Sequence, residues 1–222
     1  MTVSGAVDAA GDDALAARIE HARLYAIVDL AYVAKGDEPA VLERLIAGGV
    51  DIVQLRGKRQ TLDELTTITQ QLLEVTGPAS TPLVINDYPE IARRLPVQGV
   101  HLGQDDAAIA SARACVRRPV VVGKSTHSLE QALAAEREGA NYIGFGPLFA
   151  TPTKPEYTPI GLDRIRELHE KVRIPIFCIG GINIDNLQQV IDAGAKRVVM
   201  VSALLRARSI LDYVRCATDM LA

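Results

Sequence analysis

Three polar side chains alternate along the segment from residue 54 to residue 58. Gln54, Arg56 and Lys58 stand two residues apart, so in an extended segment they face the same side. Arginine offers a planar fork of donors and lysine a compact charge, a combination suited to a di- or triphosphate. A charged loop that faces solvent is an equally good interpretation of this triplet taken alone.

Two carboxylates, Asp87 and Asp106, follow consecutive apolar segments and could converge on one ion. Oxygen ligands without a soft ligand beside them suit magnesium better than zinc, and magnesium takes only one or two protein carboxylates. The alternative is that Asp105 or Asp106 caps the helix expected from AAIASARA. We expect Asp105 to be the cap and Asp106 the metal ligand.

Backbone amides offer a second place for a phosphate. Gly180 and Gly181 precede a helix expected to begin near Asp185, and Ser202 is expected to open the last helix. The N–H groups at such positions bind phosphate. Glycines required only for tight turns are the alternative for either site alone.

The segment GPLFATPTKPEYTPIG, residues 146–161, has four prolines and no hydrophobic period. This profile is typical of a functional lid loop. Thr151, Thr153 and Lys154 are the side chains in it best suited to chemistry. His127 could serve as a general base, but at the start of an expected helix it is better explained by capping or packing.

Eight short apolar segments precede these polar residues. Continuous apolar runs are typical of strands buried on both faces, and the intervening segments are long enough for crossover helices. Leu62, Leu65, Ile68, Leu72 and Val75, for example, fall on one helical face. The expected strands are residues 24–29, 50–55, 82–87, 99–103, 119–123, 141–146, 175–181 and 196–202, with further helices at 40–47, 129–138, 162–171 and 184–193.

Eight such units predict an α/β fold of the TIM (β/α)8 barrel class. In these barrels the active site lies at the C-terminal ends of the strands, where the polar residues named above stand. An open doubly wound sheet is the competing architecture, but no glycine-rich turn follows Asp29. We expect one catalytic domain over residues 23–222, after an extension at residues 1–22 that is partly disordered or helical.

Composition limits the classes of partner. The chain has 222 residues, a formal charge of −3 and 48% hydrophobic residues. This balance argues against nucleic-acid and membrane partners, and no apolar stretch reaches the roughly 18 residues of a membrane span. Cys115, Cys178 and Cys216 are odd in number and widely spaced, and the first 20 residues lack the features of a signal peptide. We therefore expect free thiols and a cytoplasmic location.

With these residues in view, the chain resembles the thiamine-phosphate synthases, also called thiamine-phosphate pyrophosphorylases. The resemblance extends from about residue 24 to residue 205. It implies the same barrel, one Mg²⁺ per subunit and small phosphorylated substrates, and it is compatible with a homo-oligomer. It rests on seven motifs in order: QLRGK at 54–58, IND at 85–87, GVHLGQDD at 99–106, GKSTHS at 123–128, GPLFATPTK at 146–154, IGGI at 179–182 and VSAL at 201–204.

The family joins a hydroxymethylpyrimidine diphosphate to a thiazole phosphate, or its carboxylated tautomer, giving thiamine phosphate and pyrophosphate. The reaction that the resemblance implies is dissociative: pyrophosphate leaves, and the thiazole nitrogen attacks the resulting carbocation. No general base is needed, and the implied catalytic residues are Arg56, Lys58, Lys154 and Ser125. The implied binding residues are Gln54, Arg56, Lys58, Asn86, Ser125 and Lys154 for the pyrimidine diphosphate, Thr151, Thr153, Gly181, Val201 and Ser202 for the thiazole phosphate, and Asp87 and Asp106 for magnesium.

Two features depart from the family pattern, and two other functions stay open. Tyr88 stands where many relatives have arginine, and the stretch from Pro155 to Pro159 is idiosyncratic. A related thiazole tautomerase would use a histidine at the position of His127, yet it needs no diphosphate and magnesium site. A non-catalytic barrel that binds a phosphate ligand is the third reading, because fold alone does not determine function.

Overall fold

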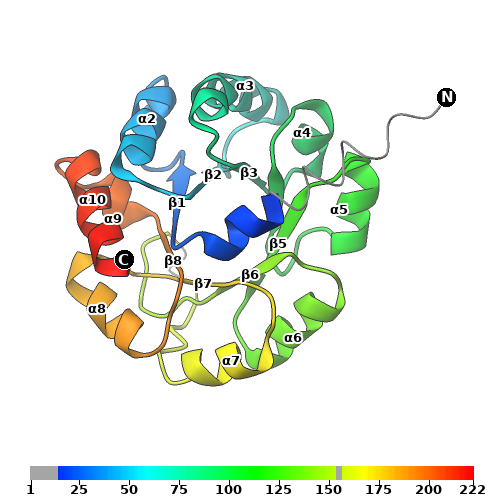
Figure 1. The fold of residues 1–222 in the computed structure, drawn as a ribbon. Helices are drawn as coiled ribbons and strands as arrows, with labels where there is room; N and C mark the ends of the chain where they lie inside the picture. The colour runs from blue at the N-terminus through cyan, green and yellow to red at the C-terminus, as the bar shows by residue number, and fades with distance from the viewer. Residues whose placement is uncertain (1–14, 154–156) are drawn as a thin grey trace.

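Eight parallel strands close into a barrel in the computed structural model, which describes residues 15–153 and 157–222. Each strand pairs with the next along the chain, and β8 pairs with β1 (Figure 1). The TIM-barrel fold expected from the sequence is confirmed. The strands are β1 (Leu24–Asp29), β2 (Ile52–Arg56), β3 (Leu83–Asn86), β4 (Gly99–Leu102), β5 (Val121–Thr126), β6 (Tyr142–Phe145), β7 (Ile176–Ile179) and β8 (Val198–Met200).

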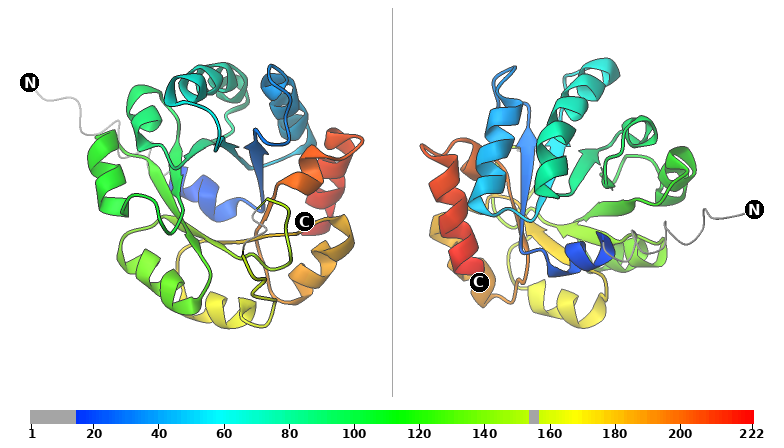
Figure 2. Two further views of the ribbon diagram at one scale, coloured as in Figure 1. Left: turned by 180° about the vertical axis from the view of Figure 1, so that it is seen from behind. Right: turned by 45° about the horizontal axis from the view of Figure 1, so that its top comes forward.

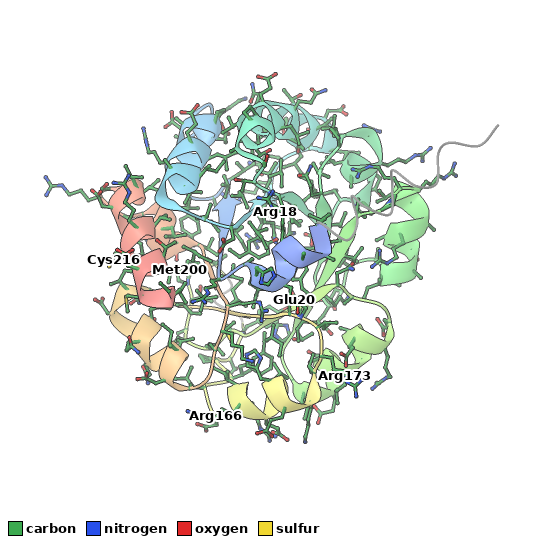
Figure 3. All side chains as sticks on the ribbon, in the orientation of Figure 1. Arg18, Glu20, Arg166, Arg173, Met200 and Cys216 are labelled. Carbon is green, nitrogen blue, oxygen red and sulfur yellow. The ribbon has the colours of Figure 1, made fainter. Side chains whose placement is uncertain are left out.

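Helices form a ring around the strands, and charged side chains lie on the outside of the ring, as Arg166 of the helix at residues 165–171 does at the rim (Figure 3). The helices are α2 (Glu38–Gly48), α3 (Leu62–Ala79), α4 (Pro89–Arg94), α5 (Ile109–Val116), α6 (Leu129–Arg137), α7 (Ile165–Lys171), α8 (Ile184–Asp192), α9 (Ser202–Leu205) and α10 (Ile210–Leu221). No helix in the described ranges is long and apolar enough to cross a membrane.

Several expected element boundaries were wrong by a few residues. Ser202 opens the short helix α9, and α10 follows it as the last helix. The strand expected at 119–123 is β5 at Val121–Thr126, so Ser125 is a strand residue rather than a loop residue. Helix α7 begins at Ile165 instead of residue 162, because residues 162–164 form a turn in which the Ile165 N–H donates to Leu162 O at 3.1 Å.

Alternation along the strands divides the buried side chains into two clusters. In β1, Leu24, Ala26 and Val28 pack toward the helices, whereas Tyr25 and Ile27 point into the barrel. This period of two follows from strand geometry. The barrel is therefore filled from the inside, as in other barrels of eight strands.

A helix at residues 15–21 lies across the N-terminal end of the barrel. Ile19 is 1% exposed and belongs to the interior cluster, with Leu15 packed against it. The helix crosses the middle of the barrel in Figure 1, and the loop after β6 lies in front in the view from behind (Figure 2). The opposite end, where the strands finish, is thus the one available to a ligand.

Candidate active site

Two adjoining pockets lie at the C-terminal ends of the strands. The larger has a volume of about 500 Å³ and extends over the loops after β6, β7 and β8. The smaller, of about 210 Å³, lies over the ends of β2, β3 and β4. Arg56, Asn86 and Ser125 line both pockets, so the two form one continuous site with two compartments.

Ion pairs hold the cationic side chains of the smaller pocket. The Arg56 guanidinium donates to the Asp29 carboxylate, which is only 1% exposed, and the Lys58 ammonium pairs with Asp87. Asp29 ends β1 and also accepts the Ala31 N–H at 2.9 Å. The Lys58 side chain is half-exposed. Arg56 is therefore fixed in place, whereas Lys58 can turn toward a ligand.

The carboxylates of Asp87 and Asp106 lie within hydrogen-bonding reach of each other. Burial and the neighbouring Asp106 raise the pKa of Asp87 to about 6, although Lys58 opposes the shift. Burial also raises the pKa of Asp106, but hydrogen bonds from Asp87 and the Gly103 N–H outweigh it, so the net shift is downward. Opposite shifts are expected of two carboxylates that compete to ionise. A cation between them would remove that competition.

The loop after β4 presents Asp106 to the smaller pocket. Asp106 Oδ2 accepts the Gly103 N–H at 2.6 Å, and the buried Lys124 donates to the Gly103 carbonyl at 2.6 Å. A Cβ at Gly103 would stand 2.6 Å from Asp106 Oδ2 and would displace this carboxylate from its present position. The expected helix cap at Asp105 was wrong: α5 begins at Ile109 after Ala108, without a side-chain cap.

An all-oxygen set of two carboxylates fits a magnesium ion better than a zinc ion. Both side chains line the smaller pocket beside Asn86 and Asp105. Within the described ranges no group of three or more His, Cys, Asp or Glu side chains could hold a metal. Magnesium that takes the rest of its shell from water and phosphate needs no such group.

Close approach of two loops shapes the larger pocket. Gly180 and Gly181 have φ of 102° and 68°, and a Cβ on Gly181 would stand 2.6 Å from the Ala150 carbonyl oxygen. The Leu148 N–H donates to Ile179 O at 2.9 Å, and the Phe149 N–H to Gly180 O at 3.0 Å. These glycines thus serve tight turns and close contact at once. Gly181 lines the pocket opposite Ser202 and Ala203, whose N–H groups open α9 and have no partner inside that helix.

The described part of the loop after β6 brings threonines to the larger pocket. Thr151 and Thr153 line it, and the Thr153 N–H donates to Thr151 Oγ1 at 3.3 Å. The Tyr32 hydroxyl lies 3.3 Å from Thr153 Oγ1 and ties this loop to the one after β1. Lys154 lies outside the described residues.

His127 packs against its surroundings at the edge of the larger pocket. Its Nδ1 contacts the Gly146 carbonyl, and its ring packs against that of Tyr157 at a tilt of 42°, with centroids 4.9 Å apart. Ser128, rather than His127, caps α6 by accepting the Gln131 N–H at 3.2 Å. The packing interpretation expected from the sequence agrees with these contacts.

Comparison with known proteins supplies the family. Residues 24–204 match the family model described as thiamine monophosphate synthase. The chain belongs to this family. It is 39% identical over 189 residues to the thiamine-phosphate synthase of Halalkalibacterium halodurans, covering 85% of this chain and 90% of that one. It is 40% identical over 194 residues to that of Chloroflexus aurantiacus, covering 87% and 89%.

Solved structures agree with the family. The thiamine phosphate pyrophosphorylase of Pyrococcus furiosus superposes with a TM-score of 0.83 at 28% identity, covering 93% of this chain and 97% of that one. The (S)-3-O-geranylgeranylglyceryl phosphate synthase of Thermoplasma acidophilum, 12% identical, shares the fold with a TM-score of 0.69, covering 100% and 98%. The protein is therefore an enzyme, a transferase of thiamine biosynthesis.

The structure of this thiamine-phosphate synthase family member brings the expected site residues together, with Lys154 outside the described ranges. The larger pocket is lined by Gln54, Arg56, Asn86, Ser125, Thr151, Thr153, Gly181, Val201 and Ser202, and the smaller by Arg56, Lys58, Asn86, Asp87, Asp106 and Ser125.

Several residues of the site escaped the sequence analysis. Asp29 pairs with Arg56, and the Tyr32 hydroxyl contacts Thr153. The Tyr25 hydroxyl contacts both Gln54 and the Tyr142 hydroxyl. The tyrosines occupy inward positions of strands β1 and β6, where apolar side chains are the rule. A tyrosine at an inward strand position could have indicated a hydrogen-bond partner inside the barrel, because a buried hydroxyl needs one.

Proposed function

We propose that the enzyme joins 4-amino-2-methyl-5-hydroxymethylpyrimidine diphosphate to a thiazole phosphate and releases pyrophosphate. The observation that carries this proposal is the sharing of Arg56, Asn86 and Ser125 between the two pockets. A ligand in each compartment would then meet at these three side chains. Joining two phosphorylated substrates requires such contact, since proximity supplies much of the rate.

The smaller pocket would hold the diphosphate of the pyrimidine substrate. Arg56, fixed by Asp29, presents a rigid fork of donors, and Lys58 brings a mobile charge to the same pocket. We assign one Mg²⁺ per subunit to Asp87 and Asp106, and Lys154 to the same diphosphate. The bound ion would add positive charge beside the leaving group.

The larger pocket would hold the thiazole phosphate. Gly181 and Ser202 line it after β7 and β8, the two places where barrels of this class bind phosphate. Val201 adds an apolar wall, and Thr151 and Thr153 add hydroxyls from the loop after β6. Gln54 and Ser125 would hold the pyrimidine ring where the compartments meet.

The reaction breaks the bond between the pyrimidine methylene carbon and a diphosphate oxygen, and the electron pair leaves with pyrophosphate. The thiazole nitrogen then forms a new bond to the same carbon. The cationic groups of Arg56, Lys58 and Lys154 would neutralise charge on the departing pyrophosphate, which is electrostatic catalysis without a protein nucleophile. No residue is assigned as a general base.

The deciding experiment supplies both substrates with Mg²⁺, with and without EDTA, and measures thiamine phosphate by thiochrome fluorescence. We expect product only with Mg²⁺. A folded protein that gives no product contradicts the proposal. If that protein interconverts thiazole carboxylate tautomers instead, the tautomerase reading is correct, although His127 is already engaged by Gly146 and Tyr157.

We also propose that the enzyme acts in the cytoplasm. Cys115, Cys178 and Cys216 are all free, and Cys216 is exposed on α10. Thiols persist unpaired in a reducing compartment.

A further inference from the structure

A chain of hydrogen bonds crosses the interior of the barrel beneath the two pockets. Gln54 Nε2 donates to the Tyr25 hydroxyl at 2.8 Å, and the hydroxyls of Tyr25 and Tyr142 lie 3.1 Å apart. The Tyr142 hydroxyl lies 3.2 Å from His101 Nδ1, and His101 Nε2 lies 2.9 Å from Ser125 Oγ. The two ends of the chain, Gln54 and Ser125, both line the larger pocket.

The middle of the chain is out of contact with solvent. Tyr25 is 1% exposed, Tyr142 is fully buried and neither lines the pocket. Burial raises the pKa of both hydroxyls, so each keeps its single proton at any physiological pH. Each tyrosine can therefore donate in one direction only, which makes the chain directional.

One glycine, Gly123, makes room for this chain of hydrogen bonds. Tyr142 of β6 reaches His101 of β4 across Gly123 of the intervening strand β5. A Cβ on Gly123 would stand 2.5 Å from Tyr142 Cε2 and 2.6 Å from His101 Nδ1. Only glycine at this position lets the two rings meet, so the backbone accommodates this particular contact.

The direction of the chain follows from its first bond. Gln54 Nε2 donates to Tyr25, and in the arrangement that we infer the Tyr25 proton points to Tyr142 and the Tyr142 proton to His101 Nδ1. A neutral imidazole that accepts at Nδ1 carries its proton on Nε2 and donates to Ser125 Oγ. The Ser125 hydroxyl proton is then left for a ligand in the pocket.

At the other end of the hydrogen-bond chain, Gln54 presents an acceptor to the pocket. Gln54 is 2% exposed, and its Oε1 is a buried acceptor without a hydrogen bond from the described residues. A buried acceptor of this kind is costly unless a ligand supplies the donor. The pocket thus offers one acceptor and one donor at fixed places, which suits a heteroaromatic ring with an amino group and a ring nitrogen.

We propose that Tyr25, Tyr142 and His101 are positioning residues that fix the donor–acceptor polarity of Gln54 and Ser125 toward the aminopyrimidine ring. Gln54 Oε1 accepts from the amino group, and Ser125 donates to a ring nitrogen. The inference rests on the proposed function, because it assumes that the pyrimidine substrate enters this part of the site. Tyr25 and Tyr142 line neither pocket and act through the two ends of the chain, and His101, which lies at the wall of the larger pocket, acts through its hydrogen bond to Ser125.

The first test measures KM for each substrate in Tyr142→Phe, which removes one hydroxyl and keeps the ring. We expect KM for the pyrimidine diphosphate to rise about tenfold, the size of one net hydrogen bond, while KM for the thiazole phosphate stays the same. Phe177→Leu is the matched control. Phe177 packs edge-on against Tyr25 and Tyr142 at centroid distances of 5.5 Å but carries no polar atom. The Phe177→Leu substitution should lower the Tm and leave the KM values for both substrates unchanged.

A double-mutant cycle separates positioning from packing. If Tyr142 acts through Ser125, its substitution should have little effect once Ser125 is gone. The KM for the pyrimidine diphosphate in the double variant Tyr142→Phe/Ser125→Ala should therefore differ less than about twofold from the KM in Ser125→Ala. Additive effects would overturn the proposal. Tyr25→Phe, which cuts the chain at its other hydroxyl, repeats the test if Tyr142→Phe does not fold.

The tautomer of His101 gives a readout independent of activity. Nitrogen NMR of the labelled protein should show a protonated Nε2 and an unprotonated Nδ1. The opposite tautomer, or a KM for the pyrimidine diphosphate that Tyr142→Phe and Tyr25→Phe leave unchanged, overturns the proposal. Wild-type protein that makes no thiamine phosphate would instead refute the proposed function, so the two failures are distinguishable.

Discussion

Gly181 stands so close to Ala150 that a single added carbon would lie 2.6 Å from the Ala150 carbonyl oxygen. The contact joins the turn after β7 to the loop after β6, two segments that both line the larger pocket. Its φ of 68° is a second reason for glycine, since other residues are strained there. The position of the loop and the proposed phosphate site therefore depend on the same residue.

Gly181→Ala should damage the larger pocket selectively. We expect KM for the thiazole phosphate to rise about tenfold or more, because the loop must shift away from the turn, while KM for the pyrimidine diphosphate changes little. Steady-state kinetics with each substrate varied in turn checks this. Gly139→Ala is the control: its φ is 88°, but nothing lies within 4 Å of the added Cβ. It should cost about 1 kcal/mol of stability and leave the kinetics unchanged.

Arg56 should prove to have two separable roles. Arg56→Ala removes a cation from the proposed diphosphate site and also leaves the buried Asp29 without its ion-pair partner. We expect kcat to fall about 100-fold or more. Unpairing a buried charge should also cost about 3 kcal/mol.

The double variant Arg56→Ala/Asp29→Asn distinguishes these roles. It removes the unpaired charge, so we expect it to regain most of the Tm lost by Arg56→Ala without regaining kcat. Thermal unfolding and turnover, measured on the same preparations, distinguish the contribution of Arg56 to stability from its contribution to kcat. Recovery of both properties together would mean that Arg56 matters only for stability.

Asp87 and Asp106 should control the requirement for magnesium. In Asp106→Asn we expect the Mg²⁺ concentration for half-maximal activity to rise about tenfold or more, since one anionic oxygen ligand is lost. Titration of activity with Mg²⁺ measures this. Asp105→Asn removes the same charge from the neighbouring position and should shift the requirement far less. An unchanged requirement in Asp106→Asn would remove that residue from the metal site.

His169 should make the fold sensitive to acid. Burial, with Lys196 and Arg197 nearby, lowers its pKa to about 4 from an ordinary value of 6.5, and its buried Nε2 has no hydrogen bond from the described residues. The folded state therefore disfavours the charged ring. Stability is fully present above about pH 6.5 and falls as the pH drops toward 4.

The expected loss from His169 is about 1–2 kcal/mol, less than the full shift allows because the side chain is partly exposed. Urea unfolding at pH 7 and pH 4.5 measures it. His169→Gln should reduce the pH dependence by that amount. His21→Gln, at an exposed position, should leave it as in the wild type.

The sequence by itself determined the barrel. Eight apolar segments at strand length, each followed by an amphipathic or turn-rich stretch, permit few other folds, because parallel strands need crossover connections. The order of these segments along the sequence also placed Arg56, Asp87, Asp106 and Ser202 at or after the C-terminal ends of strands. In a barrel these ends lie at the same side of the molecule. Boundaries were less certain, since β5 extends through Thr126 and takes Ser125 into the strand.

Only the tertiary structure decided which side chains meet. Asp29 pairs with Arg56 from the neighbouring strand, and Tyr25 meets Tyr142 over a separation of 117 residues. Neither contact leaves a periodic signal along the chain, because the first depends on the register of β1 against β2 and the second on two strands that face each other across the barrel. Gly123 illustrates the reason: in the sequence it is one glycine among 17, and in the barrel it is the space through which Tyr142 reaches His101.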